Sequence, residues 1–141
     1  MLQEGLKLTG KLTIALNDEK VLEVDNLVVT TGKNFVASRM KDTTDAAMSH
    51  MAIGTGSTAA AAGDTALGSE SARTALTSTT VTNNEIVYVD NFAAGSGTGA
   101  ITEAGIFNAS SGGTMLCRTV FATVNKGASD SMSITWTVTV S

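Results

Sequence analysis

The amino-acid sequence predicts a mainly β protein, an antiparallel β-sandwich or jelly-roll-like domain of about eight strands with one short helix. Apolar and polar residues alternate along several short stretches, which is the pattern of strands with one buried face. Turns rich in Asn, Asp and Gly separate these stretches at the spacing typical of sandwiches. Only residues near 32–41 change to a helical period.

Composition sets the class of protein. With 141 residues, we expect a single domain, residues 1–141. The net charge of −4 disfavours binding to nucleic acid, and a single cysteine excludes an intrachain disulfide or a multi-cysteine metal site. No signal peptide or membrane-spanning apolar stretch is visible. We therefore expect a soluble protein, made in the cytoplasm, that binds neither nucleic acid nor a membrane.

The first forty residues predict a hairpin followed by the helix. Residues 17–20 form a turn, and residues 21–30 return as a second strand rich in Val and Leu. Thr30 or Thr31 is the expected N-cap of the helix. The first strand is predicted because five aliphatic residues share one parity: Leu6, Leu8, Leu12, Ile14 and Leu16.

The middle of the chain predicts one short strand and a long connection. Residues 50–54 form a buried strand ending in glycine. The alanine run in residues 57–63 is too short to nucleate a helix, so we expect a surface loop there. Residues 64–73 follow as a turn or a single helical turn. Next come two strands, 74–81 and 85–92, joined at Asn83-Asn84, a pair that tolerates positive φ.

Two further stretches complete the sandwich. Residues 101–121 predict a hairpin near its centre, with strands on either side of the Ser110–Gly113 turn. The last strand, residues 132–140, is the most regular, and Trp136 lies on its apolar face, so we expect this side chain in the core. Its other face is a ladder of Ser and Thr.

Glu103 conflicts with its surroundings. The period of two places it on one face with Ile101, Gly105 and Phe107. An unpaired charge between large apolar side chains is costly. We therefore expect Glu103 to be substantially buried, with a cation or several hydrogen-bond donors at its carboxylate.

No catalytic, cofactor-binding or metal-binding set emerges from the sequence. His50 has no second ligand nearby, and Cys117 is expected to be a small core residue. The glycine-rich segments lack the endings that phosphate loops require, so we interpret them as turns. Asp64 and Glu70 are better explained as caps or surface charges than as a catalytic pair. We expect a non-enzyme without a cofactor.

Several stretches carry a resemblance to a known family. Their order resembles the N-terminal, particle-attaching module of bacteriophage tail-collar and tail-fibre proteins. The resemblance covers roughly residues 30–141 and includes a lysine-bearing turn, residues 125–127. The stretches are Asn-Phe-Val-Ala-Ser at 34–38, Met-Ser-His-Met-Ala-Ile-Gly-Thr-Gly at 48–56, Thr-Ala-Leu-Gly-Ser-Glu-Ser-Ala-Arg at 65–73 and Ile-Thr-Glu-Ala-Gly-Ile-Phe at 101–107.

The resemblance implies a phage structural protein on the virion surface. The shaft and tip of a fibre are missing from the sequence, so a capsid decoration (cement) protein is the first expectation. Its partner would be the lattice of the major capsid protein, bound as a homo-oligomer. A short tail or fibre-attachment protein, bound to tail or baseplate proteins, is the alternative. Residues 1–30 lie outside the module, so we expect them to be a contact arm on a sandwich core of residues 31–141.

A carbohydrate-binding adhesion module is the second alternative. Such a module needs an exposed aromatic platform or a polar cleft. Only Tyr88 and Trp136 could provide the platform, and the parity of the last strand assigns Trp136 to the core.

The same resemblance suggests a partner for Glu103. The basic residues after position 41 are Arg73, Arg118 and Lys126. Arg73 closes the segment that accompanies the Glu-x-Gly strand of the family-like pattern, Glu103-Ala104-Gly105, and its planar fork suits a carboxylate. We expect Arg73 to pair with Glu103, with Arg118 on the adjoining strand as the alternative.

Overall fold

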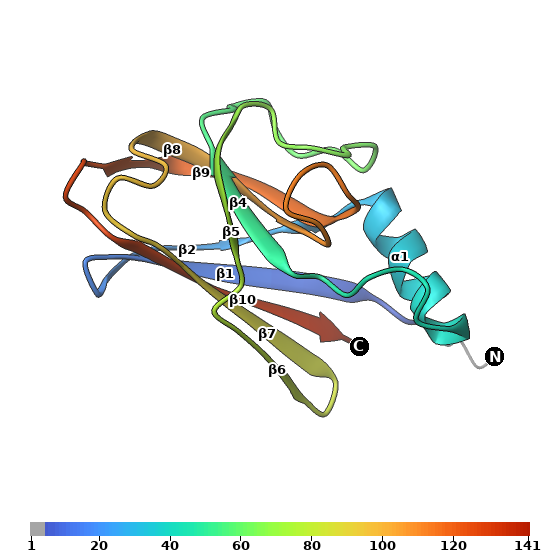
Figure 1. The fold of residues 1–141 in the computed structure, drawn as a ribbon. Helices are drawn as coiled ribbons and strands as arrows, with labels where there is room; N and C mark the ends of the chain where they lie inside the picture. The colour runs from blue at the N-terminus through green and yellow to red at the C-terminus, as the bar shows by residue number, and fades with distance from the viewer. Residues whose placement is uncertain (1–4) are drawn as a thin grey trace.

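The computed structural model describes residues 5–141, in which ten strands form two five-stranded antiparallel sheets beside one helix (Figure 1). The strand order is β2-β1-β10-β7-β6 in sheet A and β3-β9-β8-β4-β5 in sheet B. This confirms the mainly β sandwich with one short helix, although there are ten strands rather than about eight. The bounds are β1 Leu8–Leu16, β2 Glu19–Asp25, β3 Leu27–Val28, α1 Thr30–Lys41, β4 His50–Gly54, β5 Glu70–Ala75, β6 Ser78–Thr82, β7 Glu85–Phe92, β8 Gly99–Phe107, β9 Met115–Lys126 and β10 Met132–Val140.

Strand β1 is an interior strand of sheet A. It pairs with β10 along its whole length, from Leu8 opposite Val140 to Leu16 opposite Met132. Its side chains Leu12 and Ile14 are 0 % exposed and belong to the main core. For the described residues 5–30, the expected separation of a contact arm (residues 1–30) from a core of residues 31–141 is therefore wrong, because the apolar face of β1 packs inside the sandwich. Residues 1–4 of the expected arm lie outside the described residues.

The helix begins near the expected place but without the expected cap. Its N-cap is Val29, and no side chain caps it. Thr30 and Thr31 use their polar groups elsewhere: the backbone N–H of Thr30 donates to the Ala62 carbonyl (2.8 Å), and the Thr31 hydroxyl donates to the Met115 carbonyl (2.9 Å). Tertiary contacts thus take the place of a local cap.

The chain crosses from one sheet to the other between β5 and β6. Residues 70–75 pair with β4 in sheet B, although residues 70–73 were expected as part of a turn. Residues 78–82 pair with β7 in sheet A, around Asn83, whose φ of 54° fits the predicted tight turn. The single strand expected at 74–81 is therefore two strands in different sheets.

In the described part of the chain, the buried apolar side chains form two clusters. The larger fills the space between the sheets and includes Trp136, which is 0 % exposed, as its parity predicted. The smaller cluster lies on the other face of sheet B and consists of Val29, Ala52, Leu67, Phe107 and Met115.

In residues 5–141 no helix is long and apolar enough to cross a membrane.

A register shift in β8 separates two residues that the sequence pattern placed on one face. The shift lies between Ile101 and Glu103 in the pairing with β9. Ile101 consequently faces the main core, whereas Phe107 belongs to the outer cluster. The prediction that Ile101 and Phe107 share a face with Glu103 is wrong for Ile101, because the register between β8 and β9 shifts at this point. From Ile101 opposite Val124 to Glu103 opposite Val120, β8 advances by two residues and β9 by four.

Candidate functional site: a buried carboxylate under the 55–69 loop

The connection between β4 and β5, residues 55–69, arches over the outer face of sheet B (Figure 1). Its run of alanines forms neither helix nor strand, as predicted. Leu67 is the one residue of this loop in the outer apolar cluster. The rest of the loop is held mainly by polar contacts to side chains of the sheet beneath it.

Glu103 of β8 is the centre of these contacts. Its side chain is 0 % exposed, which confirms the predicted burial. Oε2 accepts hydrogen bonds from the backbone N–H groups of Gly56 (2.6 Å) and Ser69 (2.7 Å), and Oε1 accepts one from Gly68 (2.7 Å). One carboxylate therefore binds both ends of the loop.

Arg118 of β9 completes the site and is the ion-pair partner of Glu103. Its Nε and Nη2 atoms donate to Oε1 of Glu103 at 3.1 and 2.9 Å. The same guanidinium donates through Nη1 to Asp64 (2.8 Å) and through Nη2 to the Thr58 carbonyl (3.0 Å). Arg118 thus ties the middle of the loop to the carboxylate that holds its ends.

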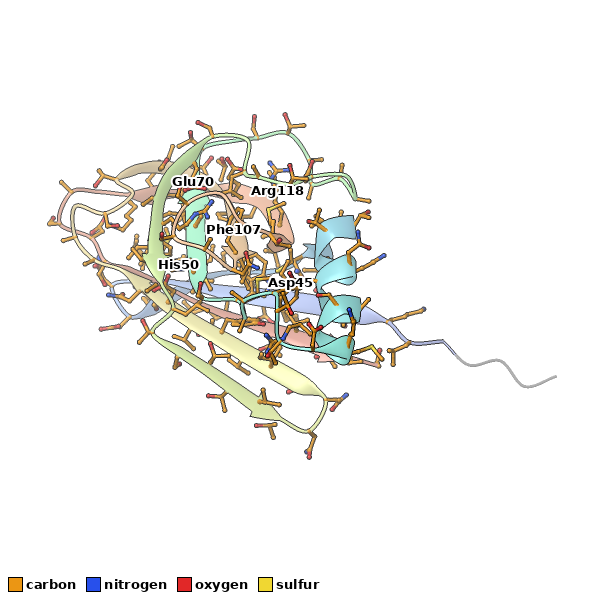
Figure 2. All side chains as sticks on the ribbon, turned by 45° about the vertical axis from the view of Figure 1, so that its right-hand side comes forward. Asp45, His50, Glu70, Phe107 and Arg118 are labelled. Carbon is orange, nitrogen blue, oxygen red and sulfur yellow. The ribbon has the colours of Figure 1, made fainter. Side chains whose placement is uncertain are left out.

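The expected pairing of Glu103 with Arg73 is wrong. Arg73 of β5 instead pairs with Glu70 (2.7 Å) and donates to the carbonyls of Ala109 and Gly112. Its guanidinium carbon lies 3.7 Å from the ring centre of Phe107. Figure 2 shows Arg118 and Glu70 on the loop side of the sandwich. Each arginine has its own acidic partner, and the strand register explains the choice: Arg118 is opposite Gly105, two residues from Glu103.

Two glycines leave the room that this arrangement needs. A Cβ atom on Gly56 would lie 2.3 Å from Oε2 of Glu103. A Cβ atom on Gly105 would lie 3.0 Å from the Leu67 side chain and 3.3 Å from the Cys117 carbonyl. Gly105, the glycine of the Glu-x-Gly pattern, therefore has a structural role, since its missing side chain lets the loop lie close to the sheet.

The surroundings of Glu103 favour its charged form. Burial by itself would raise the pKa of this carboxyl. The hydrogen bonds from Ser69, Gly68, Arg118 and Gly56 outweigh burial and lower the pKa below its ordinary value of 4.5. Both oxygens already accept hydrogen bonds, and the group is closed to solvent. In its charged form Glu103 therefore serves as a structural anchor that holds the 55–69 loop on sheet B.

The lowered pKa makes stability depend on pH in a defined direction. A carboxyl whose pKa is lower in the folded state contributes stability above its unfolded pKa and loses it as the pH falls through its folded pKa. We expect the unfolding free-energy difference between wild type and Glu103→Gln to be constant above about pH 6 and to shrink below 4.5. Denaturant unfolding at a series of pH values measures it.

Asp90 provides a control of opposite sign. Burial raises its pKa above the ordinary value of 3.8, despite hydrogen bonds from Thr74 and Asn91. Its contribution is present below 3.8 and is lost as the pH rises through the folded pKa. Asp90→Asn should therefore gain stability relative to wild type as the pH rises. Parallel pH profiles for the two variants would contradict both assignments.

A pair of glycines in the loop gives a matched test of the anchor. We expect Gly56→Ala to destabilise the protein by about 1–3 kcal/mol, because the new methyl group must displace the carboxylate from its donors. Gly63 lies in the same loop, and a Cβ atom there would meet nothing within 4 Å. Gly63→Ala should therefore change the unfolding free energy little. Thermal or denaturant unfolding separates the two, and equal losses would argue against the anchor.

The sequence pattern did not predict the burial of two charged residues, Asp90 and Lys126. Asp90 is 1 % exposed and accepts a hydrogen bond from Thr74 (2.5 Å), which links sheet A to sheet B. Lys126 is 1 % exposed and donates to the Ala93 carbonyl (2.9 Å). Asp90 could have been found, because it has the parity of Tyr88 and Phe92 and is the one charged residue among them.

The other candidates have structural positions. His50 begins β4 and contacts the Ser49 hydroxyl through Nδ1 (2.7 Å). Cys117 is 0 % exposed, and burial raises the pKa of its thiol, so it is a core residue as expected. In residues 5–141 no three His, Cys, Asp or Glu side chains are placed to hold a metal ion. Comparison of the chain with protein-family models, curated proteins and solved structures finds no match.

Proposed function

We propose that this chain is a bacteriophage virion structural protein, and specifically a capsid decoration protein on the outer surface of the head. One observation carries the proposal: three of the stretches that resemble the particle-attaching module meet at one carboxylate. Gly56 ends the stretch 48–56, Gly68 and Ser69 belong to the stretch 65–73, and Glu103 belongs to the stretch 101–107. The family-like pattern thus corresponds to a single structural unit.

The geometry of this unit suits a protein that acts by binding. The loop 55–69 is fixed by the fold itself, through Glu103 and Arg118. A surface that is already ordered loses less conformational entropy when a partner binds it. A decoration protein stabilises a head because it binds the assembled lattice and not the free subunits, which is a mass-action effect. The partner in this proposal is the lattice of the major capsid protein.

The alternatives differ in their support. A tail or fibre-attachment protein draws on the same motifs and differs only in its place on the particle. A carbohydrate-binding adhesion module has less support, because both aromatic side chains that could form its platform are buried: Tyr88 is 5 % exposed and Trp136 is 0 % exposed.

The test is the location of the chain in purified particles. Phage particles from the strain that encodes this chain are disrupted, and full heads, empty heads and tails are separated on a density gradient. Peptide mass spectrometry then measures the chain in each fraction relative to the major capsid protein. The proposal predicts that the chain copurifies with heads, empty heads included. Recovery with tails alone would favour the attachment role, and absence from all particles would contradict a virion function.

A further inference from the structure

Strand β6 forms one edge of sheet A, and all five of its residues are exposed. Its sequence, Ser-Thr-Thr-Val-Thr, contains no charge and no proline. Proteins normally protect such edges with charged residues, prolines or bulges, because unpaired backbone groups bind other strands. The opposite edge, β2, follows this rule and carries Glu19, Lys20, Glu23 and Asp25. Strand β5, at an edge of sheet B, carries Glu70 and Arg73.

An apolar groove of about 360 Å³ lies beside β6, between α1 and the β6–β7 hairpin. Thr79 and Ile86 line it, together with Met40, which is 83 % exposed. In the hairpin Val81 is opposite Ile86, and directly opposed residues lie on the same face of a sheet. Val81 is 68 % exposed. The unprotected edge therefore has a projecting apolar side chain on the face that also borders the groove.

We propose that β6 pairs antiparallel with β6 of a second copy of this chain, about a two-fold axis at Thr80. In this register Thr80 faces its own equivalent. Val81 of each copy is opposite Thr79 of the other, next to the groove that Thr79 lines. The pairing joins two A sheets into one continuous sheet and covers two exposed Val81 side chains.

A second copy fits this edge because the edge is self-complementary. Each copy supplies an uncharged strand, a projecting Val81 and a groove. A two-fold axis brings these same features of both copies into one interface. The chain carries a net charge of −4, and pairing through β6 avoids placing charged side chains opposite each other. The equivalent pairing of β2 about its central residue Leu22 would place Glu19 of each copy opposite Asp25 of the other. This inference does not depend on the proposed role in a virion.

Charge at the axis gives the first test. In Thr80→Lys two like charges lie directly opposite across the paired strands, which opposes pairing. Val21→Lys is the control, since Val21 is also exposed (47 %) but lies on β2 at the other edge. Sedimentation velocity should show a dimer for wild type and for Val21→Lys, and a monomer for Thr80→Lys that still unfolds cooperatively. A monomeric wild type, a dimeric Thr80→Lys or a monomeric Val21→Lys would overturn the proposal.

Cross-linking tests the register itself. Two cysteines at position 80 would face each other with Cβ atoms about 4.5–5.5 Å apart. In the same register two cysteines at position 82 would be opposite Ser78 and four residues apart along the strands. A short bifunctional thiol reagent should therefore link Thr80→Cys into a dimer and leave Thr82→Cys monomeric; the native Cys117 is 0 % exposed. Equal linking of both variants, or of neither, would contradict this pairing.

Discussion

Replacement of Glu103 by alanine is expected to lower the free energy of unfolding by about 3–5 kcal/mol, because it removes the buried partner of the Arg118 charge and leaves only the partly exposed Asp64 beside it. Arg118 is 2 % exposed. The change also removes the acceptor of the backbone N–H groups of Gly56, Gly68 and Ser69. An exposed ion pair would contribute only about 0–1 kcal/mol, so the size of the loss reports burial. Denaturant unfolding measures it directly.

A double-mutant cycle identifies the partner. Glu103→Ala and Arg118→Ala remove two ends of one interaction, so their effects should fail to add in the double variant. Arg73→Ala is the matched control, because Arg73 pairs with Glu70 instead. Its effect should add to that of Glu103→Ala within about 0.5 kcal/mol. Additive effects of Glu103→Ala and Arg118→Ala, or strong coupling of Glu103 to Arg73, would contradict the site described above.

Deletion of residues 1–30 is expected to abolish cooperative folding. It removes β1 from the interior of sheet A and leaves one side of β10 unpaired. Three wholly buried side chains, Leu12, Ile14 and Val29, are lost with residues 1–30. The truncated chain should show no cooperative unfolding transition by circular dichroism. A truncated chain that unfolds cooperatively near the wild-type temperature would show that the segment is a separable arm.

Point substitutions in β1 test the same assignment without truncation. Ile14→Ala should cost about 2–5 kcal/mol, because it creates a cavity between the sheets. Thr13 is the adjacent residue and faces the opposite side of sheet A, between Glu23 and Thr135. Thr13→Ala should therefore change stability by about 0.5 kcal/mol or less. Similar losses for the two variants would place β1 outside the core.

Local patterns in the sequence predicted most of the elements. The strand at residues 50–54, the Asn83-Asn84 turn and the burial of Trp136 follow from parity and turn chemistry, which act over a few residues. The sequence pattern does not reveal that the strand expected at 74–81 divides between two sheets. That division depends on which strands find partners, and the partners are far away in sequence.

The candidate site could be predicted only in part, because it too depends on contacts between residues that are far apart in the sequence. Burial of Glu103 follows from its apolar neighbours on β8, but the backbone donors come from a loop 34–47 residues earlier in the chain. Register decided between the two arginines, since Arg118 lies across from Gly105 on the adjoining strand. The family-like sequence pattern favoured Arg73, but it contains no information about the register of β8 and β9. The register shift between Ile101 and Glu103 depends on the pairing with β9, so the face of Ile101 could not be obtained by counting alternate residues along β8.

Hydrogen exchange at three backbone amides tests most directly whether Glu103 holds the loop 55–69. Gly68 and Ser69 are exposed residues, so their N–H groups would exchange rapidly without the carboxylate. In wild type the amides of Gly56, Gly68 and Ser69 should be protected, and Ser57 next to them should exchange freely. In Glu103→Ala, under conditions where the domain stays folded, protection of all three should disappear while the sheet amides keep theirs. Rapid exchange at these amides in wild type, or unchanged protection in Glu103→Ala, would contradict the anchor.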